Sequence, residues 1–168
     1  MRVTQRAVVA MVFAVGLFLM PHISMGHPPL SATVEFGQPN VGSPFPAPSG
    51  HDQSSNAKDN LVPRTVVISL GGTVTFDTFG AHQVAIYAPG TEPEDIDTTI
   101  VAAPLPGCPP IPLINDPLNR VALLGAQPCA GGPTTVSYTF NEPGKYLIIC
   151  VFGPHFTDFD MYGWVIVK

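Results

Sequence analysis

Glycine and proline occur so often in this chain that they limit how long any regular element can be. Together they fill 36 of the 168 positions, as 16 Gly and 20 Pro. Proline interrupts the interior of helices, and both residues favour turns. No segment shows a sustained helical period in its apolar residues. The sequence therefore predicts short strands separated by turns, and the fold class that we expect is all-β.

Several short segments alternate apolar and polar residues, which is typical of strands with one buried face. Gly71 and Gly72 are expected to turn the chain between two of these strands. Pro143 and Gly144 fit the central positions of a type II turn, which predicts a hairpin between the strands on either side. One face of the strand before Gly71 is expected to carry Leu70. The predicted strands are 32–37, 65–70, 73–79, 82–87, 135–140, 146–151 and 161–168.

Two segments lack this regularity. Residues 27–60, rich in Pro, Gly, Ser and Asn, are expected to form an N-terminal arm that can include the strand at 32–37, followed by a folded domain over 61–168. Residues 88–133 are typical of an irregular insertion. Within it, Thr91 with Glu94 resembles a capping box. Asp116, Pro117 and Gly125 fit the N-cap, first-turn proline and closing glycine of a second helical turn.

The first residues have the layout of a secretory signal peptide. Arg2 and Arg6 precede an apolar run of fourteen residues at 7–20, and small residues follow just before His27. A membrane span needs about 20 apolar residues. We therefore expect residues 1–26 to be a signal peptide, a periplasmic or secreted location, and no membrane span in the mature chain. An uncleaved anchor is the alternative.

The charge of the chain argues against binding to nucleic acid. The formal net charge is −5, and loss of Arg2 and Arg6 with the signal peptide would change it to −7. No Lys/Arg cluster follows, whereas nucleic-acid binding requires one. The part of the chain after Gly26 is long enough for one domain with a core and too short for two ordinary ones.

Three cysteines are an odd number for an exported chain, so one of them is expected to lie outside any intramolecular bridge. Cys108 and Cys129 flank a Pro-rich stretch, while Cys150 lies in an apolar run. We expect a disulfide between Cys108 and Cys129 that closes the insertion and stabilises the fold by roughly 3 kcal/mol. Cys150 is then either part of a site or a buried, inert thiol.

Cys150 begins the run Cys-x4-His-x5-Met, which continues with His155 and Met161. A thiolate, an imidazole and a thioether form a graded set of soft to borderline ligands, and with a second imidazole this set suits copper. His82, which opens a predicted strand, is the candidate for that second imidazole. Taken singly, these residues have plainer readings as a surface His, a core Met and a strand His. Taken together, they favour a metal site.

Two other metal chemistries stay open. A thiolate with two imidazoles also holds zinc, with Asp158 or Asp160 as the fourth ligand. Cleavage after Gly26 would place the amino group of His27 beside its imidazole, a pair that chelates copper in oxidative enzymes and that would need His51 nearby.

At these residues the chain resembles the cupredoxins, in particular the plastocyanin, auracyanin and rusticyanin types. Three segments carry the resemblance: Gly-Gly-Thr-Val-Thr-Phe followed by Ala-His-Gln-Val, Pro-Gly-Lys-Tyr-Leu-Ile-Ile-Cys, and Met-Tyr-Gly-Trp-Val-Ile-Val-Lys. The resemblance implies a Greek-key β-sandwich with a disulfide-closed insertion. It also implies one type 1 copper ion, with His82, Cys150 and His155 as equatorial ligands and Met161 as the long axial ligand. Two departures from the family pattern stand out. Ala81 and Gln83 replace an Asn that commonly adjoins the first ligand, and the His155–Met161 interval is slightly longer than in its nearest relatives.

The function implied by the resemblance is one-electron transport, with no enzymatic activity, to a redox partner protein such as a c-type cytochrome. Phe156 and Phe159 either form an exposed apolar patch through which electrons leave or pack under the loop. Two alternatives share parts of this prediction. One is a copper carrier or storage protein with the same ligands, and the other is a metal-free β-sandwich binding module with Cys150 merely buried.

Overall fold

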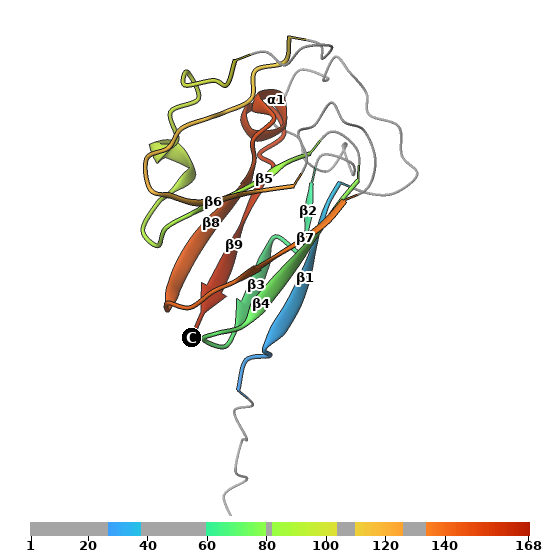
Figure 1. Cartoon of the computed structure of the whole chain (residues 1–168), viewed down its shortest axis with the longest axis vertical. Helices are drawn as coiled ribbons and strands as arrows, with labels where there is room; N and C mark the ends of the chain where they lie inside the picture. The colour runs from blue at the N-terminus through green and yellow to red at the C-terminus, as the bar shows by residue number, and fades with distance from the viewer. Residues whose placement is uncertain (1–26, 38–59, 80–81, 104–109, 126–133) are drawn as a thin grey trace, which may run out of the picture.

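The computed structural model describes residues 27–37, 60–79, 82–103, 110–125 and 134–168, which form two facing β-sheets (Figure 1). The first sheet contains β1 (Ser31–Phe36), β2 (Leu61–Val62), β4 (Thr73–Thr78) and β7 (Thr134–Thr139), in the order β2-β1-β4-β7. The second contains β3 (Thr65–Ile68), β5 (Val84–Tyr87), β6 (Arg120–Leu124), β8 (Gly144–Cys150) and β9 (Tyr162–Val167), in the order β3-β9-β8-β5-β6. The predicted all-β sandwich is confirmed.

The strand expected at 32–37 belongs to the first sheet. It is β1, which runs parallel to β4 over its whole length and pairs with β2 on its other side. Val34 and Phe36 are buried in the core. The chain therefore contributes to the sandwich from Ser31 onward, before the boundary at residue 61.

The main core lies between the sheets and follows the predicted alternation closely. Side chains two residues apart point to the same face of a strand, so each strand buries alternate apolar residues. Leu70 departs from the prediction, because β3 ends at Ile68 and the Leu70 side chain is 51% exposed in the turn that follows. The core is made of Val34, Phe36, Leu61, Val66, Ile68, Val74, Phe76, Val84, Ile86, Phe140, Tyr146, Ile148, Cys150, Phe152, Met161, Val165 and Val167.

The outer face of the second sheet carries its own apolar layer, which the alternation of residues along the strands does not predict. Part of the 88–133 insertion folds back over β5 and β8, bringing Ile96 and Ile114 onto the sheet. The last five residues of β8 are consequently all buried, including those on both of its faces. The layer consists of Ala85, Tyr87, Ile96, Ile114, Leu147, Ile149, Val151 and Phe156.

The hairpin predicted at Pro143 and Gly144 is wrong, although a turn is present there. β7 belongs to the first sheet and β8 to the second, so the turn carries the chain across the sandwich. Strands that face each other across a core have the same alternation as paired strands, and alternation alone does not separate the two cases. The neighbour of β8 along the chain is β9, with which it pairs antiparallel.

The two helical turns expected in the insertion also need correction. A short 3₁₀ helix spans Pro93–Asp95, but its capping box joins Glu92 to Asp95 and does not involve Thr91 with Glu94. The segment between Asp116 and Gly125 forms β6 instead of a helix. Asp116 accepts a hydrogen bond from the Leu118 amide (2.9 Å), which is an Asx-type turn. Gly125 ends the strand with a φ of 87°.

Several predictions fall on residues outside the described ranges. These are the signal peptide at 1–26, the disulfide between Cys108 and Cys129, His51, and Ala81. Within the described ranges, no helix has the length and apolar character that crossing a membrane requires.

Candidate metal centre

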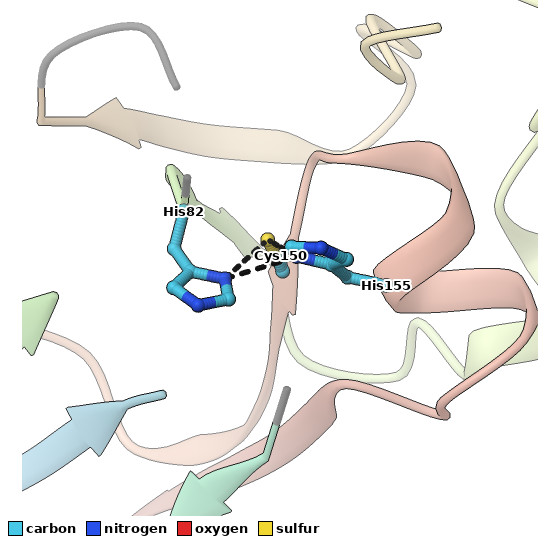
Figure 2. A group of neighbouring side chains, drawn as sticks. All are labelled: His82, Cys150 and His155. Carbon is cyan, nitrogen blue, oxygen red and sulfur yellow. Dashed lines mark hydrogen bonds between the residues drawn. The ribbon is translucent and has the colours of Figure 1, made fainter. Parts of the chain in front are cut away.

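The sandwich brings His82, Cys150 and His155 together at the end where the short helix α1 (Gly153–Thr157) lies (Figures 1 and 2). His82 lies just before β5, Cys150 is the last residue of β8, and His155 belongs to α1. β5 and β8 are neighbours with Val84 opposite Cys150, so the approach of His82 to the thiol follows from strand register.

Three donor atoms converge in a triangle. The Cys150 Sγ lies 3.6 Å from the His82 Nδ1 and 3.7 Å from the His155 Nδ1. The two Nδ1 atoms are 3.0 Å apart. Figure 2 shows the His82 ring on one side of the sulfur and the His155 ring on the other. Among the described residues this is the group of His, Cys, Asp and Glu side chains able to hold one metal ion.

Both imidazoles are held in the neutral form. Burial lowers the pKa of His82 to about 4. Burial and, to a smaller extent, repulsion by His82 lower the pKa of His155 to about 2. A neutral imidazole keeps a lone pair available, which is the state that binds a metal. The two rings are therefore ready to act as ligands at neutral pH.

Main-chain hydrogen bonds hold the candidate ligands in place. The Val151 amide donates to the Gln83 carbonyl (3.0 Å) and so joins the segment carrying His82 to the segment carrying Cys150. The Cys150 amide donates to the Met161 carbonyl (3.0 Å), and the Met161 amide donates to the His155 carbonyl (2.9 Å). Each candidate ligand is thus tied to the next through backbone groups, whose geometry varies little compared with side chains.

Met161 lies immediately before β9 and is fully buried. Its two main-chain bonds place its backbone between Cys150 and His155. The longer interval between His155 and Met161 is filled by the end of α1 and a turn at Asp160, where φ is 48°.

Aromatic rings shield His155. The Phe152 ring centroid is 4.1 Å from the His155 ring centroid, and the Phe159 ring centroid is 6.3 Å from it. Phe156 and Phe159 are only 7% and 4% exposed, so the reading in which both pack under the loop is correct and the exposed apolar patch is not formed. A shell of this kind excludes water and is one of the factors that set a metal's redox potential.

Gln83, which stands near the position where an Asn is common, makes two contacts. Its carbonyl accepts the Val151 amide, and its side-chain Nε2 donates to the Gly125 carbonyl (3.2 Å) at the end of β6. The loop carrying Cys150 is therefore braced by the main chain of Gln83, while the side chain braces the segment to the edge strand.

The loop that follows Cys150 and carries His155, called the metal loop below, has a second brace. This brace comes from the insertion and was not predicted. The Ile114 amide donates to the Val151 carbonyl (2.8 Å), and the Gly153 amide donates to the Pro112 carbonyl (2.9 Å). Residues 112–114 therefore run alongside 151–153, with Leu113 bridged to Phe152. The sequence contains one local indication of an extended segment here. Apolar residues alternate at 111 and 113, although the apolar residue at 114 interrupts the alternation.

Asp116 anchors that brace. Its carboxylate is 2% exposed and accepts the amides of Asp97 (3.0 Å) and Leu118 (2.9 Å). The Tyr87 hydroxyl on β5 donates to the Asp116 carbonyl (3.1 Å). Burial raises the pKa of Tyr87 to about 12, which keeps its donor proton in place. Hydrogen bonds to the buried Asp116 thus fix the insertion to the sheet, and they satisfy the polar groups of that residue.

The donor set fits copper better than zinc. Zinc favours four firm ligands, and neither Asp158 nor Asp160 belongs to the group formed by His82, Cys150 and His155. One thiolate with two imidazoles is the equatorial set of blue-copper sites, which add a weak axial ligand such as a thioether. His27 is exposed and lies on the segment before β1, outside this group.

No protein-family model matches the chain, and no curated protein matches its sequence. Solved structures do resemble it. Dithionite-reduced auracyanin from Roseiflexus castenholzii is 18% identical, with 84% of this chain and 98% of that chain covered and a TM-score of 0.50. Auracyanin A, a blue copper protein from Chloroflexus aurantiacus, is 19% identical over 83% and 99%, with a TM-score of 0.45. Rusticyanin from Thiobacillus ferrooxidans is 26% identical over 82% and 76%, with a TM-score of 0.41.

At 18% identity, the likeness to the Roseiflexus auracyanin extends to the fold, and the chemistry has to come from the site itself. The fold and the side chains of the site agree with each other. The described part of the chain is a β-sandwich with a buried His-Cys-His site at one end, and its fold is that of the cupredoxins.

Proposed function

We propose that this chain binds one type 1 copper ion through His82, Cys150 and His155, with Met161 as the axial ligand, and acts as a one-electron carrier. The observation that carries the proposal is the buried triangle of one Sγ and two Nδ1 atoms, with sides of 3.0 to 3.7 Å, in a cupredoxin-like sandwich. The change of oxidation state that stores one electron would come from the bound copper.

The residues of the chain supply what such a carrier needs. The two neutral imidazoles bind without first losing a proton, whereas the Cys150 thiol must release one, so loading is expected to acidify an unbuffered solution. Thiolate and imidazole are acceptable to both oxidation states of copper, and a weak thioether leaves the reduced ion satisfied. The main-chain links among the ligands keep their positions similar in both states, which lowers the cost of electron transfer.

Copper titration of the purified protein tests the proposal. We expect Cu(II) to produce an intense visible charge-transfer band and a spin-resonance spectrum with a small copper hyperfine splitting. Cys150→Ser should abolish the band, because the sulfur supplies the transferred charge. Met161→Leu is the matched control, since it keeps the thiolate and should retain a coloured site. Colour that persists in Cys150→Ser would refute the ligand assignment.

A copper carrier or storage protein would have the same ligands. Repeated chemical reduction and oxidation separates the two functions: an electron carrier keeps its copper through many cycles, and a storage protein releases the reduced ion to a chelator. We propose a location in the periplasm or outside the cell, where the acidic net charge of the mature chain, −7 after loss of Arg2 and Arg6, suits a basic redox partner such as a c-type cytochrome.

A further inference from the structure

Arg64 lies far in sequence from the run Cys-x4-His-x5-Met, yet its side chain donates hydrogen bonds to the backbone on both sides of Met161. It lies just before β3, and its guanidinium donates through Nη2 to the Asp160 carbonyl (2.8 Å) and through Nε to the Tyr162 carbonyl (3.1 Å). The guanidinium carbon also lies 4.9 Å from the centroid of the Tyr162 ring. Two donors of one rigid, planar group therefore hold the carbonyls of the residues on either side of Met161.

The main chain of Arg64 is fixed in turn by β9. The Trp164 amide donates to the Arg64 carbonyl (2.7 Å), which extends the parallel pairing of β3 with β9 by one residue. Gly163 makes this approach possible, because a Cβ at that position would collide with the Arg64 carbonyl. Arg64 is thus anchored through its backbone to Trp164 on β9 and through its side chain to Asp160 and Tyr162, the residues on either side of Met161.

Met161 depends on such a brace more than the other candidate ligands do. Its side chain has three rotatable bonds, and its thioether is only a weak hydrogen-bond acceptor, so the sulfur position depends on the packing of the buried side chain and on the backbone position from which it starts. The chain bends sharply just before it, with Asp160 in the left-handed region at a φ of 48°. A bend of that kind in a residue other than glycine persists where surrounding contacts hold it. The Asp160 carbonyl accepts from two donors, the Tyr162 amide (2.7 Å) and the Arg64 guanidinium, and Arg64 is the one that reaches it from another strand.

We propose that Arg64 is a positioning residue for the axial ligand: by holding the carbonyls of Asp160 and Tyr162, it sets how closely the Met161 thioether approaches the metal. This inference rests on the proposed function for its consequence, since the axial distance is one control on the potential of a blue-copper site. The placement of Met161 by Arg64 is a property of the protein without metal.

The test therefore begins with the metal-free protein. Carbon-13 labelling of methionine methyl groups gives one resonance for Met161, identified as the peak lost in Met161→Leu. We expect Arg64→Gln to shift and broaden that resonance, because the forked donor is lost. Arg64→Lys should shift it less, because one donor and the positive charge remain. Arg120→Gln is the matched control, since Arg120 lies on β6 at the opposite edge of the same sheet and donates to Asn115. It should leave the resonance unchanged.

Copper-loaded samples provide the second measurement. Arg64→Gln should change the ratio of the visible charge-transfer bands and the reduction potential, while Arg120→Gln should change neither. A folded Arg64→Gln protein with the wild-type Met161 resonance would overturn the inference, even if its melting temperature fell, because Arg64 would then be a purely structural brace. If Arg64→Gln does not fold, the same criterion applies to Arg64→Lys. Failure of the wild type to bind copper would refute the proposed function and leave the methyl measurement intact.

Discussion

His82 and His155 present their Nδ1 atoms to each other at 3.0 Å, with both side chains at most 5% exposed. Two imidazoles this close cannot both carry a proton without strong repulsion, and burial penalises the charge of each. The pair is therefore built for the neutral state. It is separated by 73 positions in sequence and is brought together by the pairing of β5 with β8 and by the helix α1, which follows β8 and carries His155.

This pair predicts acid instability of the metal-free protein. The pKa values of His82 (about 4) and His155 (about 2) in the fold lie below the ordinary value of 6.5, so the unfolded chain binds more protons in acid. Stability should be independent of these groups above pH 6.5 and should fall as the pH drops below it, by at most about 1.4 kcal/mol per pH unit for each histidine. Urea unfolding between pH 4 and 7 measures the slope.

His155→Gln removes one of the two groups and should reduce that slope, while the carboxylates common to both proteins contribute equally. A slope between pH 5 and 6.5 that is the same in the variant and the wild type would show that His155 keeps an ordinary pKa in the fold.

Copper should stabilise the fold against unfolding. A ligand that binds only the native state adds about 2.7 kcal/mol to the free energy of unfolding at a free concentration 100 times its dissociation constant. Thermal unfolding with and without Cu(II) measures this, and a strong chelator should reverse the gain. Cys150→Ser should gain much less stability than the wild type; equal gains would place the bound copper elsewhere.

Asp116→Ala should destabilise the protein by about 1–3 kcal/mol, because the amides of Asp97 and Leu118 lose their carboxylate acceptor. Asp116→Asn keeps one carbonyl oxygen and should cost less. Asp158→Ala is the matched control: this carboxylate is exposed and accepts a bond from Thr157, so the change should lie within about 0.5 kcal/mol. Urea unfolding of the three variants gives the comparison, and equal losses for Asp116→Ala and Asp158→Ala would remove Asp116 as an anchor.

The sequence predicted the parts of the structure that depend on short-range pattern. Alternation located most strands, and the donor types and order of His82, Cys150 and His155 were enough to predict that they meet. The same patterns could not assign strands to sheets, which is why the turn at Pro143 was taken for a hairpin. Asp116 with Pro117 has the same local chemistry at a helix start and in an Asx turn, so only the neighbouring strand β5 decides between them.

The braces around the site left little local trace in the sequence. Arg64 contacts the Asp160 carbonyl across 96 positions, and a single arginine before a strand has many possible partners. Residues 112–114 lie beside the metal loop because the insertion folds over the outer face of the sheet, and that return depends on the whole sandwich. Long-range contacts of this kind follow from topology, which the order of strands in the chain does not give.

The burial of β8 on both faces also affects how a bound metal ion would dissociate. Cys150 ends an interior strand flanked by β5 and β9, with the sheet opposite on one side and the folded-back insertion on the other. Local fraying is confined to segments with few such neighbours. The rate of copper release should therefore follow the rate of global unfolding. Hydrogen exchange at the β8 amides, measured on the same protein, is the quantity to compare with that release rate.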